Sequence, residues 1–156
     1  MLSIDIPGRG HLDLEHLVLD VNGTLAFDGE LIPGVAEALA AVSGTLHPVA
    51  ITADTQGTAH NMAAELGIEV HIVERGAEAA QKLAFVRELG AASVAAIGNG
   101  VNDAAMLREV ALGVCVVGGE GASAEAMHAA DVVTGDIVHA IGLLAHPARL
   151  AATLRR

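Results

Sequence analysis

Short apolar runs of strand length alternate along this chain with longer segments of helical periodicity, and Gly, Pro, Asn and Asp residues separate them. This alternation is typical of α/β proteins with a parallel sheet. The expected strands cover residues 16–21, 48–52, 69–73, 93–97, 112–117 and 131–133, and the expected helices cover residues 33–42, 55–66, 77–89, 102–110, 122–130 and 137–144, before a short tail. Ahead of them, residues 4–6 and 12–14 flank a Pro-Gly-Arg-Gly turn and predict an N-terminal β-hairpin.

The length of 156 residues suits one domain that spans residues 1–156. Every connection between the expected elements is short, so we expect no inserted domain of any size. No apolar stretch approaches about 18 residues without glycine or charge, and the first residues are too acidic for a signal peptide. The one cysteine, Cys115, has no partner for an internal disulfide. We therefore expect a cytoplasmic protein with no membrane partner.

The charge balance excludes a further class of partner. The chain has 19 acidic and 8 basic side chains, which gives a net charge of −11 at pH 7. Such a surface repels the phosphate backbone of nucleic acids, and two Phe residues offer little stacking surface for bases. We expect no nucleic-acid partner. The apolar content of 53% is compatible with a homo-oligomer.

Ligands of an open parallel sheet bind beyond the carboxyl ends of its strands, so the residues that follow each strand are the candidates for a site. The first central strand ends in Asp20, and residues 21–24 then form a turn whose N–H groups can face an anion. A plain Asn-Gly turn is an equally good interpretation of that segment alone. The second strand ends at Thr52, where a Thr near a helix start is more often an N-cap than a ligand.

Lys82 lies in the helix expected at residues 77–89 and is the only lysine of the chain, beside seven arginines. Most lysines on helices are solvated surface charges. A chain that otherwise uses arginine but keeps one lysine suggests a site that needs a compact charge on a flexible stem, which a planar guanidinium cannot replace. We therefore predict a functional role for Lys82.

Residues 98–103, Gly-Asn-Gly-Val-Asn-Asp, connect an expected strand to a helix and come close to the GxGxxG pattern of dinucleotide-binding loops. Glu120 even follows at about the distance of the acidic residue in that pattern. However, Asp103 stands where the third glycine is required, and its charge would repel a pyrophosphate. We therefore reject dinucleotide binding.

Asparagine is concentrated in two of these loops. Asn22 lies in the first, Asn99 and Asn102 lie in the second, and the chain has only one other asparagine. Amide, carbonyl and carboxylate oxygens are the ligands that hard cations prefer. The two loops together therefore indicate a site for a cation such as Mg²⁺.

In order along the chain, Asp-x-Asn-Gly-Thr, a Thr, a Lys and Gly-Asn-Gly-x-Asn-Asp resemble the four motifs of the haloacid dehalogenase superfamily. Each motif alone is weak, whereas four in the right order and spacing are a strong signal. The Asn-Gly-Thr-Leu loop and the late Glu-Gly-Ala-Ser-Ala-Glu-Ala-Met segment are most similar to soluble relatives of the P-type ATPase phosphorylation domain. The resemblance implies a three-layer Rossmannoid fold, a parallel sheet with helices on both faces and no sizeable cap.

The resemblance also implies a Mg²⁺-dependent phosphatase or phosphotransferase that forms an aspartyl phosphate from a phosphorylated substrate of unknown identity. It makes Asp20 the nucleophile, Thr52 a ligand of the transferred phosphoryl group and Lys82 the neutralising cation. The catalytic set is then Asp20, Asn22, Thr52 and Lys82; the phosphate-binding set is Val21, Asn22, Gly23, Thr24, Thr52, Ala53 and Lys82; the metal set is Asp20, Asn22, Asn99 and Asp103; and Gly98, Gly100 and Asn102 support the last loop.

The chain departs from the family pattern at two positions. Asn22 stands where the phosphatases of the family carry an aspartate that acts as general acid and base. An amide cannot transfer a proton, and such a loss typically costs about 10²- to 10⁴-fold in rate, so we expect slow turnover. Asn99 stands where many relatives have a metal-binding aspartate, so we expect weaker Mg²⁺ binding.

Two other function classes stay open. A catalytically weak or inactive regulatory module that binds phosphate or metal would explain Asn22 and Asn99, although a dead site has no reason to keep Lys82. A phosphoacceptor receiver domain also combines Asp, Thr and Lys on an α/β sheet. Its acceptor lies on a middle strand, however, whereas Asp20 ends the first central strand.

Overall fold

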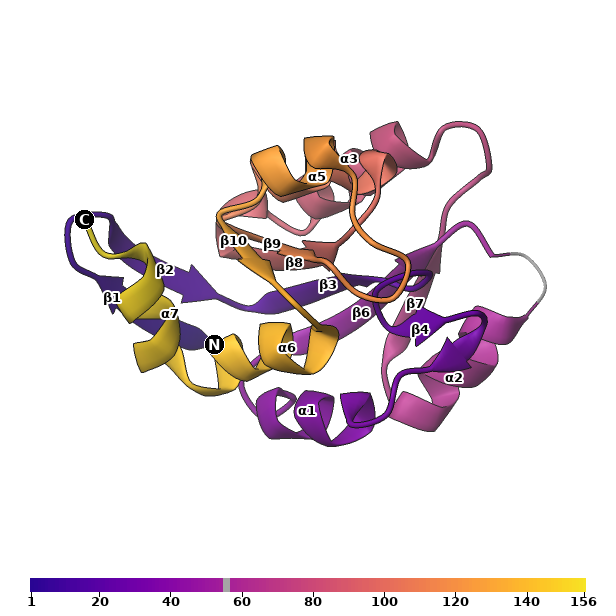
Figure 1. Cartoon of the computed structure of the whole chain (residues 1–156), viewed down its shortest axis with the longest axis horizontal. Helices are drawn as coiled ribbons and strands as arrows, with labels where there is room; N and C mark the ends of the chain where they lie inside the picture. The colour runs from indigo at the N-terminus through magenta and orange to yellow at the C-terminus, as the bar shows by residue number, and fades with distance from the viewer. Residues whose placement is uncertain (55–56) are drawn as a thin grey trace.

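Six parallel strands form the central sheet of the structure, a computed structural model that describes residues 1–54 and 57–156 (Figure 1). In chain order they are β3 (His16–Asp20), β6 (His47–Thr52), β7 (Glu69–Ile72), β8 (Val94–Gly98), β9 (Leu112–Val116) and β10 (Val132–Thr134). Their order across the sheet is β10-β9-β8-β3-β6-β7, and every pairing is parallel. The predicted parallel sheet is confirmed, with each strand within one residue of its expected bounds.

Strand β3 lies inside the sheet because its residues are apolar on both faces. Leu17, Val18 and Leu19 are fully buried, as expected of a strand between two neighbours and two layers of helices. Asp20 lies in register with Ile51 of β6, and Leu19 lies in register with Ile97 of β8. The Asp20 side chain is therefore at the point where three adjacent strands end.

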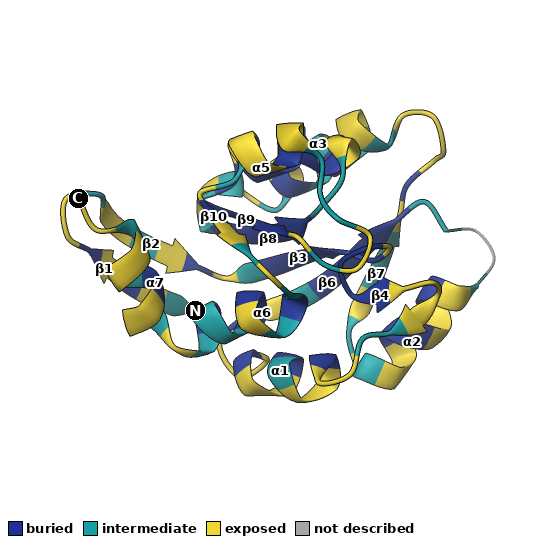
Figure 2. Ribbon diagram, in the orientation of Figure 1, coloured by how far each residue is buried: buried dark blue, intermediate teal, exposed yellow. Residues whose placement is uncertain are grey.

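Helices cover both faces of the sheet. One layer contains α1 (Val35–Val42), α2 (Thr58–Leu66), α6 (Ile137–Ala145) and α7 (Pro147–Leu154), and the other contains α3 (Glu78–Glu88), α4 (Ala104–Glu109) and α5 (Ala124–Ala129). An apolar core lies on each side of the strands, and the exposed residues of the helices face outward (Figure 2). The expected three-layer architecture is confirmed.

The N-terminal hairpin is also confirmed. Strands β1 (Leu2–Ile6) and β2 (Gly10–Leu14) pair antiparallel and form a separate two-stranded sheet. The expected short tail, in contrast, is the helix α7. Its buried Leu150 joins the same apolar core as Ile4 and Ile6, so the hairpin gives this short segment a surface to pack on.

Among the described residues, no single helix is long and apolar enough to cross a membrane. Helices α6 and α7 reach that length and composition only as a pair, and the pair is bent by 100°.

The loop between β3 and α1 contains a small antiparallel pair that the sequence analysis did not predict. Strands β4 (Ala26–Phe27) and β5 (Glu30–Leu31) are joined by Asp28 and Gly29, which have φ angles of 50° and 80°. Left-handed backbone at both positions is typical of a type I′ turn, and it matches the Asp-Gly signal in the sequence.

Every expected helix except α6 begins one to three residues later than predicted. The helix predicted from residue 55 starts at Thr58, and residues 55 and 56 lie outside the described residues. The helix predicted for residues 102–110 is divided into a 3₁₀ turn, η2 (Val101–Asp103), and α4, while η1 (Ala91–Ser93) precedes β8. The Asp103 side chain causes the division, because it accepts the N–H groups of Asn99 and Gly100 and so fixes a tight turn before α4.

Candidate active site

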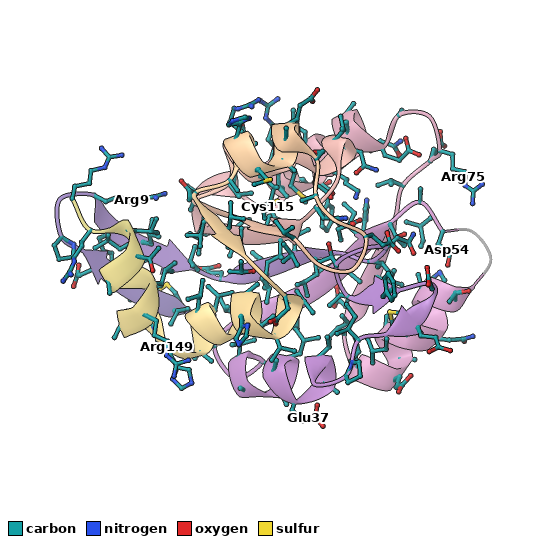
Figure 3. All side chains as sticks on the ribbon, in the orientation of Figure 1. Arg9, Glu37, Asp54, Arg75, Cys115 and Arg149 are labelled. Carbon is teal, nitrogen blue, oxygen red and sulfur yellow. The ribbon has the colours of Figure 1, made fainter. Side chains whose placement is uncertain are left out.

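The polar residues that the sequence analysis selected lie around one cavity of about 550 Å³ at the carboxyl ends of β3, β6 and β8. Of the predicted set, this cavity is lined by Asp20, Asn22, Thr52, Ala53, Lys82, Asn99, Gly100 and Asn102. Its other lining residues are Gly29, Asp54, Thr58, Arg75, Glu78 and Glu120. Figure 3 shows Asp54 and Arg75 on neighbouring loops at this end of the molecule.

Lys82 lies between two carboxylates at the bottom of this cavity. Its Nζ atom donates to Asp20 Oδ1 and to Asp103 Oδ1, and both distances are 2.7 Å. Lys82 is only 1% exposed, so its ammonium group has lost most of its water and depends on these two partners. A solvated surface charge, the alternative interpretation of Lys82, is therefore wrong.

The pKa values of Asp20 and Lys82 are both shifted by burial and by the neighbouring charges. Burial and the negative charge of Asp103 raise the pKa of Asp20 from 3.8 to about 7, against the opposing effect of Lys82. Burial by itself lowers the pKa of Lys82, but the charges of Asp20 and Asp103 outweigh it and raise this pKa above its ordinary value. Lys82 is therefore a permanent cation beside a carboxylate of raised basicity, which is the pairing that an aspartate nucleophile needs.

Asp103 is fully buried and uses both carboxylate oxygens within the protein. Oδ1 accepts from Lys82, and Oδ2 accepts the N–H groups of Asn99 and Gly100 at 3.0 Å each. Asp103 does not line the cavity, and its predicted contact with the metal, direct or through water, stays a prediction. Its carboxylate shapes the loop and orients Lys82.

Gly98 and Gly100 leave the space that the side chains of Asp103 and Asn102 occupy. A Cβ atom on Gly98 would lie 2.5 Å from Asp103 Cγ, and a Cβ atom on Gly100 would lie 2.8 Å from Asn102 Oδ1. Larger residues at either position would displace the loop. Asn102 itself is exposed and lines the cavity, and its side chain makes no hydrogen bond within residues 1–54 and 57–156, so its expected bracing role has no visible contact.

The turn after Asp20 is built by its own backbone. The N–H of Gly23 donates to the Ala26 carbonyl at 2.8 Å, and the N–H of Thr24 donates to the Val21 carbonyl at 3.2 Å. These two N–H groups are therefore engaged inside the loop, which contradicts their predicted role in phosphate binding. Asn22, in contrast, is exposed in the cavity.

Asn99 connects three loops. Its Nδ2 group donates to the Gly121 carbonyl at 3.1 Å, and its Oδ1 accepts from the buried Thr24 hydroxyl at 3.4 Å. Its backbone carbonyl accepts from Ser123 at 2.8 Å. An amide can make a donor bond and an acceptor bond at once, which an aspartate cannot, so Asn99 has a structural reason to be an amide.

Thr52 ends β6 and is 2% exposed. Its hydroxyl oxygen accepts the Asp54 N–H at 3.2 Å, and Asp54 Oδ2 in turn accepts the Ala59 N–H at 3.2 Å. The N-cap position of α2 is occupied by Gly57, so capping by Thr52, the alternative interpretation, is wrong. Thr52 lines the cavity, and because its hydroxyl donates to no group within residues 1–54 and 57–156, this O–H can donate to a ligand.

Comparisons with known proteins identify the family and the fold. Residues 5–111 match the family model of the haloacid dehalogenase-like hydrolases. The chain belongs to this hydrolase family. An uncharacterized protein of Methanocaldococcus jannaschii is 40% identical to this hydrolase over 84 residues, which are 51% of the chain and 90% of that protein.

Two further proteins are similar to this chain: one is a much longer protein, and the other is a solved structure of similar length. A probable copper-transporting ATPase of Arabidopsis thaliana is 34% identical over 129 residues, which are 78% of this hydrolase but only 12% of the ATPase. The structure of 3-deoxy-D-manno-octulosonate 8-phosphate phosphatase from Moraxella catarrhalis, in complex with magnesium, phosphate and its sugar acid, has a TM-score of 0.71 at 20% identity. It covers 91% of this chain and 94% of that phosphatase, and it shows that the two share a fold.

The residues present in the hydrolase cavity fit Mg²⁺. Asp20, Asn22 and Asn99 supply carboxylate and amide oxygens, and hard cations prefer such donors. No group of three or more His, Cys, Asp or Glu side chains suited to a metal occurs in the described part of the chain. Of these three oxygen donors only Asp20 is charged, and the expected weaker binding of Mg²⁺ stays a prediction.

Four charged residues of the cavity lie outside the predicted site set. Asp54 follows β6, Arg75 follows β7 and Glu120 follows β9, while Glu78 begins α3. The rule that ligands bind at the carboxyl ends of parallel strands points to the first three, because each comes within four residues of a strand end.

Proposed function

We propose that this hydrolase is a Mg²⁺-dependent phosphatase or phosphotransferase that forms an aspartyl phosphate on Asp20. One observation carries the proposal: the Asp20 carboxylate ends an interior strand, is bonded to the buried Lys82 and faces a polar cavity. The family match and the fold shared with a sugar-phosphate phosphatase support it.

The residues divide the work of phosphoryl transfer. Asp20 attacks phosphorus, and Lys82 neutralises negative charge that would otherwise build up between the carboxylate and the phosphoryl oxygens. The Thr52 hydroxyl and the backbone at Asn22 and Ala53 line the cavity where those oxygens come to lie. Asp20 with the oxygens of Asn22 and Asn99 would hold Mg²⁺, which supplies further positive charge to the same oxygens.

The cavity also limits the substrate. It is open and polar, and Arg75 gives it a second cation beside Lys82, so a phosphate ester with further polar or anionic groups fits it best. We include in the proposal that residues 1–156 form a single domain in the cytoplasm without a cap, so that even a large phosphorylated molecule can reach Asp20. Assembly into a homo-oligomer is part of the same proposal.

A second candidate function is a regulatory module that binds phosphate or metal with little or no turnover. It is favoured by Asn22 and Asn99, which place amides where a catalytic site of this kind would use carboxylates. The buried Lys82 argues against it, because a site without chemistry has no need for a buried cation held against its nucleophile.

Intact-protein mass spectrometry distinguishes the two functions. The protein is incubated with Mg²⁺ and acetyl phosphate or an aryl phosphate, quenched in acid and weighed, while phosphate release is followed. We expect a phosphoryl adduct or steady release in the native protein, and neither in Asp20→Asn. Asp5→Asn, on the exposed hairpin, is the matched control and should behave like the native protein. The absence of adduct and release from the native protein would favour the regulatory module.

A further inference from the structure

Three carboxylates besides Asp20 line the cavity: Asp54, Glu78 and Glu120. Two of them hold backbone groups of their own loops. Asp54 Oδ2 accepts the N–H of Ala59 at 3.2 Å, and Glu78 Oε2 accepts the N–H of Gly76 at 3.0 Å. Glu120 differs from both, because its carboxylate makes no hydrogen bond or ion pair within the described ranges 1–54 and 57–156.

Glu120 lies directly over the turn that follows the nucleophile. A Cβ atom on Gly23 would lie 2.8 Å from Glu120 Oε2 and would also collide with the side-chain amide of Asn99. The left-handed Gly23, with a φ of 79°, leaves the space that this carboxylate occupies. A tight turn, in which the Gly121 N–H donates to the Gly118 carbonyl at 2.9 Å, sets the position of Glu120 on the loop after β9.

The chemistry at Asp20 needs a group of this kind. An ordinary leaving alkoxide must gain a proton, and the water that hydrolyses an acyl phosphate must lose one. The amide of Asn22 can do neither, and Asp103 is buried with both oxygens engaged. Glu120 is an exposed carboxylate that lines the same cavity as Asn22 and approaches Gly23, the residue after it.

We propose that Glu120 is the proton-transfer residue of this site, a catalytic role that rests on the proposed function. In the first step a carboxylate oxygen of Asp20 bonds to phosphorus, the bond from phosphorus to the leaving oxygen breaks, and protonated Glu120 gives its proton to that oxygen. In the second step the Glu120 carboxylate takes a proton from water, the water oxygen bonds to phosphorus, and the bond from phosphorus to Asp20 breaks. Inorganic phosphate leaves, and both side chains return to their starting forms.

The test separates the two steps with Glu120→Gln. With an aryl phosphate, whose leaving group needs no proton, we expect the adduct on Asp20 to form at nearly the native rate. Hydrolysis of the adduct should fall by about 10²- to 10⁴-fold, so that phosphorylated protein accumulates. Glu125→Gln, on the exposed face of α5, is the matched control and should show native rates for both steps.

A second variant guards against a merely structural effect. Adding Asn22→Asp to Glu120→Gln restores a carboxylate beside the same turn, and we expect it to recover much of the lost hydrolysis. Native hydrolysis in Glu120→Gln would overturn the inference. So would an equal loss of both steps that higher Mg²⁺ reverses, because that result would make Glu120 a metal ligand. A native protein with neither adduct nor release would instead overturn the proposed function itself.

Discussion

The described residues include two clusters in which one basic side chain lies between two aspartates. At the carboxyl end of the sheet, Lys82 bonds to Asp20 and Asp103, and the three side chains are 2%, 10% and 0% exposed. On the N-terminal hairpin, His11 bonds to Asp5 at 2.6 Å and to Asp13 at 3.0 Å, and these side chains are 49%, 90% and 50% exposed. The bonds are of similar length in the two clusters, whereas burial differs greatly.

That difference in burial decides what each cluster can do. In the hairpin, water screens the charges, and the aspartates serve mainly to raise the pKa of His11 above 6.5 through their hydrogen bonds. Beneath the cavity, water is excluded, so each charge acts strongly on the others and Asp20 has its pKa raised to about 7. Burial of the charges makes Asp20 more reactive and costs stability. The exposed cluster has no large effect on reactivity or on stability.

Removing the central cation of the buried cluster should have the largest effect. In Lys82→Met, Asp20 and Asp103 face each other without a counter-charge, so we expect activity to fall by about 10²- to 10³-fold or more. Breaking a buried ion pair costs about 3–5 kcal/mol in the free energy of unfolding. Phosphate release and urea unfolding measure the two effects.

Arg87→Gln is the matched control for that experiment, because Arg87 forms an exposed ion pair with Glu109 at 2.8 Å. We expect its activity and unfolding free energy to stay near the native values. If Lys82→Met is as stable and active as Arg87→Gln, burial is not what distinguishes the two clusters.

Asp103→Asn should have an intermediate effect. The amide keeps the shape of the carboxylate, but its NH₂ group must face either Lys82 or the N–H groups of Asn99 and Gly100, all of which are donors. An unsatisfied buried group costs about 1–3 kcal/mol. We expect a stability loss of that size and a smaller activity loss than in Lys82→Met, measured by the same assays.

The same substitution in the exposed cluster, Asp13→Asn, sharpens this contrast. Asp13 accepts from Ser3 and His11 at the surface, where water can replace either bond. We expect native activity and a smaller stability change than in Asp103→Asn. Equal losses in the two variants would mean that Asp103 does not depend on its buried partners.

Most of the fold could be predicted because its signals are local. The apolar run of β3 and the Gly, Asn and Pro residues between elements define strands and helices without reference to distant contacts. Helix α7 could not be predicted in this way. Its eight residues are too few to form a stable helix alone, and the surface that stabilises them belongs to β1, more than 140 residues earlier in the chain.

The site could be predicted in part. Lys82 had a signal of its own as the only lysine, whereas Asp20 and Thr52 were ambiguous until the order of the family motifs joined them. The structure brings all three to one cavity. The use of Asp103 could not be found, because a sequence does not show that both oxygens of a carboxylate are engaged. Glu120 was considered only as part of a dinucleotide motif, and its position over Gly23 depends on a contact between distant loops.

His11→Asn should have the smallest effect, and its sign depends on pH. The folded pKa of His11 lies above 6.5, because Asp5 and then Asp13 bond to the protonated ring. The stabilisation is therefore complete below about pH 6.5 and is lost as the pH rises through the folded pKa. In thermal melts we expect His11→Asn to lower Tm by no more than about 2 °C near pH 5.5, and by almost nothing near pH 9.

His60→Asn, which alters an exposed histidine of α2, should give the same small change at both pH values. A loss in His11→Asn that does not change with pH would show that the exposed cluster acts by packing instead of charge, and only the buried cluster would then be electrostatic.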